Sequence, residues 1–154
     1  MLKPQVSLLG EAVCDWARGR TDVVAVALVG SHARGAARPD SDVDFVVVTT
    51  EPEFYRAAAW PAQIVWPSGG SVRPAWADAA YGALWARHLE LTDGTRVEVG
   101  FAAPAWARVR PVDAGTAAVV RGGCEVLWDP SGLLATLRRA VEMPASAPRG
   151  LTNR

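Results

Sequence analysis

A length of 154 residues, half of them apolar, favours one domain with a hydrophobic core. The 16 basic and 16 acidic residues cancel to zero net charge, which argues against a wide basic face for nucleic acid, and a charged share of 21% argues against wholesale disorder. No apolar run approaches the roughly 18–20 residues of a membrane helix, and we expect neither a membrane span nor a signal peptide. Cys14 and Cys124 form no metal-binding spacing, and we expect both to be reduced in a cytoplasmic protein.

Two strands and two helices are predicted at the start of the chain. Residues 4–18 repeat apolar side chains at helical spacing and predict an amphipathic helix. Residues 23–29, VVAVALV, form a continuous run rich in β-branched side chains and predict a buried strand. We expect a short helix over 32–38 and a second strand over 43–49.

The middle of the chain is harder to assign. Residues 53–60 predict a short helix, and 61–76, with several prolines, adjacent glycines and tryptophans in or beside them, predict a long irregular loop of a kind that is often functional. Residues 83–91 and 95–103 then predict a β-hairpin around Thr-Asp-Gly.

The register of this hairpin follows from burial. A two-residue turn would bury polar side chains without partners, which is costly. A three-residue loop with Gly94 in the left-handed conformation instead places Glu90 opposite Arg96 and His88 opposite Glu98 on one polar face. The apolar face then holds Leu89, Leu91, Val97, Val99 and Phe101.

The C-terminal third predicts a strand and a helix. Residues 113–121 are compatible with either helix or strand, and 124–128 predict a short strand. Asp129-Pro130 is typical of a helix start, and the apolar side chains between Leu133 and Val141 predict an amphipathic helix. We expect a single domain over 1–143 and a disordered tail over 144–154.

Polar residues that suit phosphate and metal chemistry follow the first predicted strand. Gly30 permits close backbone approach, and the Ser31 hydroxyl with free backbone N–H groups suits a phosphate, although an ordinary turn with a serine cap explains this pair equally well. Asp42 and Asp44 are two residues apart at a strand start, so both point to one face. A divalent cation would relieve their repulsion, whereas a solvated strand start would explain the pair if it stood alone.

Together these residues form the pattern G-S-x10-D-x-D, within the string GSHARGAARPDSDVDFVVV. This pattern resembles the signature of the DNA polymerase β-like nucleotidyltransferases, and especially the minimal and antibiotic nucleotidyltransferases. The resemblance implies an α+β nucleotidyltransferase fold, with a mixed sheet of about four or five strands. It also implies that helices pack on one face of the sheet and that the metal site lies on the other.

The resemblance also implies roles for individual residues. Gly30 and Ser31 would hold the phosphates of a nucleoside triphosphate, and Asp42 and Asp44 would bind one or two Mg²⁺ ions, with Mn²⁺ as an alternative. The best candidate for the family's third carboxylate is Glu98. The commoner family residue is Asp, so the sequence leaves open whether Glu98 is a metal ligand, a general base or both.

Other candidates surround this set. Arg34 is expected to clamp phosphate oxygens, Ser41 in the turn before Asp42 is counted with the nucleotide-binding residues, and Arg38 is expected to be a surface residue. A possible acceptor site is assigned to Trp60, Trp66, Trp76 and His88.

The leading hypothesis is a Mg²⁺-dependent enzyme that transfers AMP from ATP to a hydroxyl of a small molecule and releases pyrophosphate. The first alternative is an antitoxin-type minimal nucleotidyltransferase that binds or adenylylates a protein partner. The second is a catalytically silent nucleotide-binding module. The sequence does not identify the acceptor, the preferred nucleotide or a homodimer.

Overall fold

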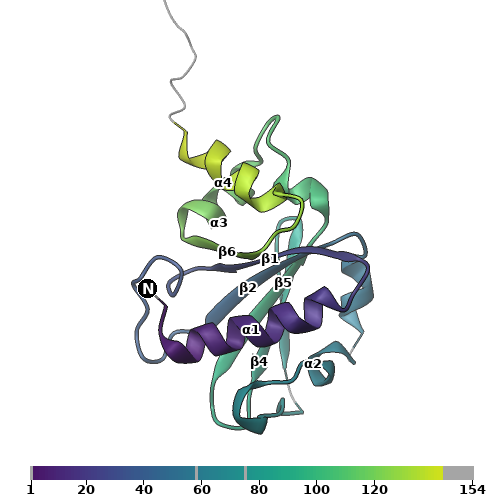
Figure 1. Ribbon diagram of the computed structural model, residues 1–154, viewed down its shortest axis with the longest axis vertical. Helices are drawn as coiled ribbons and strands as arrows, with labels where there is room; N and C mark the ends of the chain where they lie inside the picture. The colour runs from purple at the N-terminus through teal and green to yellow at the C-terminus, as the bar shows by residue number, and fades with distance from the viewer. Residues whose placement is uncertain (1, 58, 75, 144–154) are drawn as a thin grey trace, which may run out of the picture.

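A mixed β-sheet with helices on both faces makes up the structure, a computed structural model that describes residues 2–57, 59–74 and 76–143 (Figure 1). The strands are β1 (Val23–Val29), β2 (Val43–Thr49), β3 (Ala77–Tyr81), β4 (Leu84–Glu90), β5 (Arg96–Ala102) and β6 (Cys124–Trp128). The helices are α1 (Pro4–Arg18), α2 (Trp60–Gln63), α3 (Ala114–Arg121) and α4 (Leu133–Glu142), and three 3₁₀ turns are η1 (Pro52–Arg56), η2 (Pro67–Gly69) and η3 (Pro104–Ala107). No helix among these described residues is long and apolar enough to cross a membrane.

The strands lie in the order β3-β4-β5-β2-β1-β6. Strands β2 and β5 are parallel, and the other neighbouring pairs are antiparallel. The sheet thus has six strands, so the expectation of four or five is wrong. The unpredicted strand is β3, whose sequence ADAAY lacks the apolar alternation that marks a half-buried strand.

The hairpin register predicted from burial is confirmed. Glu90 lies opposite Arg96, and His88 lies opposite Glu98. Gly94 has φ 90°, the left-handed conformation that the three-residue loop requires. The polar side chains of β4 and β5 therefore share one face of the sheet.

Two apolar cores cover the two faces. On the first face, α1 packs on β1 and β2, and the segments 52–57 and 59–66 pack on β4 and β5, with Tyr55 stacked on Phe101 at 4.6 Å between ring centroids. On the second face, α3, α4 and η3 cover one end of the sheet through side chains such as Val120 and Leu134. The expectation that helices pack on one face only is therefore wrong, because the C-terminal helices bury the second face as well.

Several local predictions are corrected by the structure. Residues 31–40 form successive turns instead of a short helix over 32–38, with Gly35 at φ 74° within them. The helix predicted over 53–60 is a 3₁₀ turn at Pro52–Arg56, and α2 begins only at Trp60. The ambiguous segment 113–121 is a helix, α3, because the Asp113 side chain accepts a hydrogen bond from the Thr116 N–H and caps it.

Most of the remaining predicted elements are present. The helix over 4–18 and the strands over 23–29, 43–49 and 124–128 have their predicted bounds. The predicted loop over 61–76 contains the last turn of α2 and the turn η2. The tail predicted over 144–154 lies outside the described residues.

A half-buried hydrogen-bond network around Asp22, at the far end of β2, gives a testable pH dependence. Asp22 accepts hydrogen bonds from Thr49 Oγ1 at 2.6 Å and from the Tyr55 hydroxyl. Burial alone would raise the pKa of Asp22, but these hydrogen bonds and the charge of Arg20 bring the pKa below its ordinary value. Because its pKa is lower in the folded state, the ionised Asp22 carboxylate stabilises the folded protein above the unfolded-state pKa of about 4. This stabilisation is lost as the pH falls through the folded-state pKa.

We therefore expect Asp22→Asn to lower the free energy of unfolding by on the order of 1–2 kcal/mol at neutral pH. The difference from the wild type should shrink as pH falls below about 4. Urea unfolding between neutral and acidic pH measures it, with the exposed Asp15→Asn as the control. A difference that stays constant across this range would contradict the prediction.

Candidate active site

Three polar side chains form a row across neighbouring strands, on the sheet face that α1 does not cover. Asp44 on β2 lies beside Glu98 on the parallel strand β5, and Glu98 lies opposite His88 on β4. Neighbours of Asp44 along β2, such as Phe45, point to the α1 side and are buried. The alternation of β2 and β5 thus fixes two carboxylates next to each other.

The environment of Asp44 disfavours its negative charge. The pKa of Asp44 is raised to about 7. Burial is the largest cause, and the negative charges of Glu98 and Asp42 and a hydrogen bond to Glu98 add to it. Like charges in a partly buried site destabilise each other unless a cation or a shared proton intervenes. This crowding is typical of a functional site and is unfavourable for folding alone.

Asp42 precedes β2 and lies beside this row. Its Oδ1 is 3.0 Å from Nε of Arg96, and Arg96 also donates a hydrogen bond to the carbonyl of Asp40. Across the described parts of the chain, no three His, Cys, Asp or Glu side chains are gathered closely enough to hold a metal ion as they stand. Asp42, Asp44 and Glu98 offer carboxylate oxygens, the ligands that a hard divalent cation prefers. To bind such a cation, Asp42 would have to break its ion pair with Arg96.

Besides Asp44, Glu98 has further polar partners on β3 and β4. His88 Nε2 lies 2.8 Å from Glu98 Oε2, and the Tyr81 hydroxyl donates to the same oxygen at 3.0 Å. The pKa of Tyr81 is raised, chiefly by this hydrogen bond to Glu98. Burial and the negative charges of Glu98, Asp44 and Asp42 raise it further. Tyr81 is not among the residues predicted for the site, because it ends strand β3, which the sequence pattern does not predict. The following residue, Gly82, is a turn residue that could have indicated a strand end at Tyr81.

The turn at Gly30 packs against Asp44. Gly30 has φ 79°, and a Cβ at this position would lie 2.5 Å from Asp44 Oδ2. On the other side, the Gly30 N–H donates to the carbonyl of Gly123 at 3.2 Å. The Gly-Ser turn and the carboxylates thus form one site, and only glycine fits between them.

This contact predicts a specific effect of Gly30→Ala. The added Cβ should displace the Asp44 carboxylate and strain the backbone, so stability should fall by about 1–3 kcal/mol. The matched control is Gly35→Ala, which has a similar φ of 74° but nothing within 4 Å of the added Cβ. Thermal unfolding of both variants separates the steric clash with Asp44 from the cost of the positive φ angle, which both variants share. An equal loss of stability in the two variants would contradict a contact between residue 30 and Asp44.

Two residues assigned to the nucleotide point elsewhere in this structure. Nη1 of Arg34 donates to the carbonyl of Gly122 at 2.7 Å, so its guanidinium is directed to the turn before β6. Ser41 Oγ accepts from the Arg38 N–H at 2.8 Å within the turn that precedes Asp42. Both residues lie next to the motif, and both now have intramolecular partners.

Of the three tryptophans assigned to an acceptor site, two belong to the core. Trp60 and Trp66 are each 3% exposed, and their indole N–H groups donate to the carbonyls of Tyr55 and Pro61. Neither offers a surface to an acceptor, and the assignment of these two to the acceptor site is not supported by their position. Trp76 is 36% exposed and lies over the guanidinium of Arg87 at 4.9 Å.

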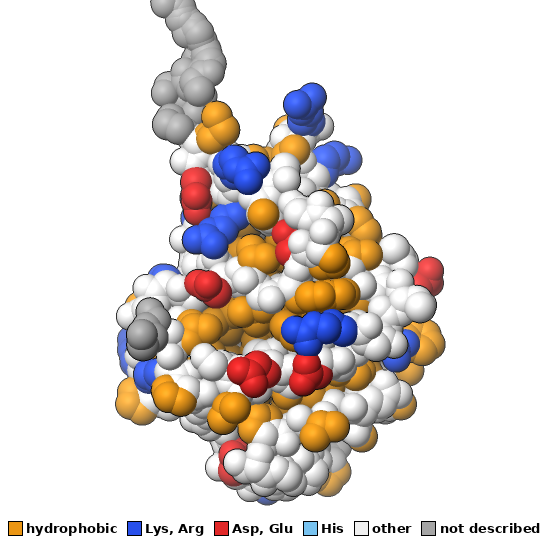
Figure 2. Space-filling view, in the orientation of Figure 1, with side chains coloured by type: hydrophobic (Ala, Val, Ile, Leu, Met, Phe, Trp, Pro, Cys, Tyr) orange, Lys and Arg blue, Asp and Glu red, His pale blue; other side chains and the backbone are white. Residues whose placement is uncertain are grey.

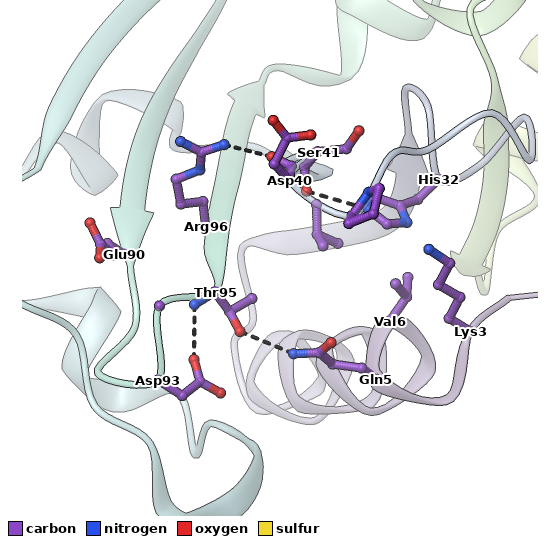
Figure 3. Close-up of a pocket in the computed structure, with 13 residues that line it drawn as sticks. Lys3, Gln5, Val6, His32, Asp40, Ser41, Glu90, Asp93, Thr95 and Arg96 are labelled. Carbon is purple, nitrogen blue, oxygen red and sulfur yellow. Dashed lines mark hydrogen bonds between the residues drawn. The ribbon is translucent and has the colours of Figure 1, made fainter.

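Two hollows lie beside Arg96. A cleft of about 400 Å³ is lined by residues that include Asp42, Trp76, His88 and Arg96. A cavity of about 550 Å³ lies beyond Arg96, between the start of α1, the turn at Asp40 and the hairpin tip (Figure 3). Val6 and Val43 line this larger cavity, so it opens on the α1 side of β2 and not on the carboxylate side.

Part of the chain matches a known protein family. Residues 10–77 match the family described as the nucleotidyltransferase domain, and this segment contains Gly30, Ser31, Asp42 and Asp44. No curated protein matches the sequence. Among solved structures, a nucleotidyltransferase-like protein from Exiguobacterium sibiricum is similar to 92% of this chain, at 13% identity and a TM-score of 0.47, and this chain spans 40% of that protein. Residues 10–77, which hold both halves of the G-S-x10-D-x-D motif, are thus similar to the nucleotidyltransferase domain family.

Proposed function

We propose that the protein transfers a nucleoside monophosphate, AMP from ATP, to a hydroxyl of a small-molecule acceptor and releases pyrophosphate. The observation that carries this proposal is the side-by-side placement of Asp44 and Glu98 against the Gly30 turn, with Asp42 beside them. The negative charges of the crowded carboxylates would be neutralised by a divalent cation. That cation would also bind a triphosphate held by the neighbouring Gly-Ser turn.

Each residue has a definite part in the reaction. Asp42 and Asp44 would hold Mg²⁺, which supplies neutralisation of the phosphate charge when bound. The backbone and hydroxyl of Gly30-Ser31 bind the phosphates and orient the α-phosphorus toward the carboxylates. Glu98 takes the proton of the acceptor hydroxyl, which must come within hydrogen-bonding distance of it.

His88 serves this proton transfer by orienting the base. Its Nε2, 2.8 Å from Glu98 Oε2, holds the carboxylate in place on the face that carries Asp44. An oriented base loses less rotational freedom when it receives a proton from the acceptor.

The cleft of about 400 Å³ beside Asp42 is the proposed acceptor site. The residues that line it include Trp76, His88, Glu90 and Arg96, so aromatic and hydrogen-bonding residues border it. Such a mixture suits a small polar molecule better than a hydrocarbon.

The test is pyrophosphate release from ATP, GTP, CTP and UTP with Mg²⁺ or Mn²⁺ and panels of small-molecule and protein acceptors. The wild type should release pyrophosphate with at least one acceptor, and the Asp42→Asn/Asp44→Asn variant should not. Equal release from both proteins would overturn the proposal. Transfer to a protein acceptor would support the antitoxin-type alternative, and nucleotide binding without release would support the silent module.

A further inference from the structure

Tyr81 places a hydroxyl group where the proposed reaction needs that of its acceptor. The hydroxyl donates a hydrogen bond to Oε2 of Glu98, the proposed base, at 3.0 Å. The side chain is 52% exposed, so solvent and a nucleotide can reach it. We propose that Tyr81 is itself an acceptor, so that the protein attaches a nucleoside monophosphate to its own tyrosine; this inference rests on the proposed function.

The strand register brings Tyr81 to this position. Tyr81 ends β3 and pairs with Leu84, and it lies on the same sheet face as His88 and Glu98. The positions between Tyr81 and Glu98 on this face are occupied by small residues: Ala79, Ala86 and Gly100. The phenol can therefore extend across the sheet to Glu98, as its hydrogen bond to Glu98 Oε2 shows.

The transfer balances with a nucleoside triphosphate and a divalent cation from solution. The Tyr81 hydroxyl gives its proton to the Glu98 carboxylate. The phenolic oxygen forms a bond to the α-phosphorus, and the bond from the α-phosphorus to the oxygen that bridges it to the β-phosphorus breaks. Pyrophosphate leaves, and the product is a phosphodiester between Tyr81 and the nucleoside.

The chain contains a matched control, because its only other tyrosine is Tyr55. Tyr55 is fully buried, and its hydroxyl donates to Asp22 and accepts from Nε of Arg20 at 2.6 Å. It lies near the end of β2 that is remote from Asp44. Self-transfer should therefore stop at one nucleotide per chain, on Tyr81.

The first experiment is mass spectrometry of the intact protein and of its peptides after incubation with ATP and Mg²⁺. We expect one added AMP, on Tyr81, in the wild type and in Tyr55→Phe, and none in Tyr81→Phe or Glu98→Gln. Because Tyr81 is half exposed, Tyr81→Phe should fold normally, which circular dichroism checks. A label on Ser31, Ser41 or any other residue would overturn the inference.

A second readout needs no turnover. Nitration by tetranitromethane should modify Tyr81 in the free protein, and an ATP analogue with a non-hydrolysable α–β bridge should protect it in the presence of Mg²⁺. Unchanged nitration of Tyr81 while calorimetry shows that the analogue binds would contradict a nucleotide beside its hydroxyl.

A mixing experiment tests whether the transfer is intramolecular. Glu98→Gln supplies an acceptor tyrosine without the base, and Tyr81→Phe supplies the base without the tyrosine, so their mixture should remain unlabelled. Labelling in the mixture would overturn transfer within one chain. An unlabelled wild type that releases pyrophosphate with an external acceptor would overturn this inference alone, whereas a protein that neither binds nucleotide nor releases pyrophosphate would overturn the proposed function as well.

Discussion

Replacing Asp44 with Asn should lower nucleotidyl transfer by about 10²–10³-fold, because a group that stabilises developing charge at the reacting centre has an effect of this size. The same change should raise the free energy of unfolding of the metal-free protein. Asp44 combines burial with the negative charges of Glu98 and Asp42, so its ionised form is costly when no cation is bound. A loss of activity with a gain of stability is the signature of a residue retained for function.

The gain in stability should depend on pH in a defined direction. A carboxyl whose pKa is raised to about 7 contributes stability below its unfolded-state pKa of about 4, and this contribution is lost as pH rises through about 7. The Asn variant has no carboxyl to ionise, so its free energy of unfolding should exceed that of the wild type by an amount that grows between about pH 4 and pH 7. After allowance for solvent screening, the advantage above neutral pH is on the order of 1 kcal/mol.

Urea unfolding in the presence of a metal chelator measures this difference, and pyrophosphate release measures the activity. The control is Asp40→Asn, which changes an exposed carboxylate in the neighbouring turn. Equal effects of the two substitutions on activity, or a wild type that is more stable than the Asp44 variant at all pH values, would contradict the role of Asp44.

The parts of the site that sequence alone could predict depend on short-range rules. Asp44 and Glu98 each alternate with apolar neighbours in a strand, so the face on which each lies is predictable, whereas their roles as carboxylates of the site are implied by the resemblance to the nucleotidyltransferases. The hairpin register followed because only one pairing avoids burying His88 and Glu90, and Gly94 supplies the conformation that this pairing needs.

The parts that sequence did not predict depend on contacts between distant segments. Trp60 and Trp66 lie in or beside the predicted irregular loop 61–76, but their packing in the core with Phe101 of β5 buries them. Strand β3 has weak strand signals and is held in place by Arg87 of β4, 3% exposed, which bonds Asp78. A buried arginine of this kind cannot be distinguished from a surface arginine in a single sequence.

Arg87 is thus expected to be the most sensitive position outside the carboxylates. Its guanidinium bonds both carboxylate oxygens of Asp78 at 2.8 and 3.0 Å and the carbonyls of Arg56 and Ala57 at 3.0 Å. These bonds join β3 and the end of η1 to β4, and the hydrogen bonds from Arg87 hold the pKa of Asp78 below its ordinary value. The ring of Trp85 lies 5.4 Å from the guanidinium carbon.

Arg87→Met keeps the length of the side chain but removes every one of these bonds. We expect it to lower the free energy of unfolding by about 2–4 kcal/mol, because hydrogen bonds to a charged group contribute about 1.5–3 kcal/mol each and two backbone carbonyls lose their donor. Amide hydrogen exchange should accelerate along β3, and the alignment of Tyr81 with Glu98 should be lost with it, because Asp78 and Tyr81 share this strand.

The control is Arg73→Met, which removes an arginine that is 50% exposed and paired with Glu90 at 3.1 Å. An exposed pair contributes at most about 1 kcal/mol, so this variant should be nearly as stable as the wild type. Urea unfolding compares the two variants, and peptide-resolved hydrogen exchange locates the loosened strand. Similar losses in both variants, or unchanged exchange in β3 of the Arg87 variant, would show that β3 is held to the sheet by its backbone hydrogen bonds alone.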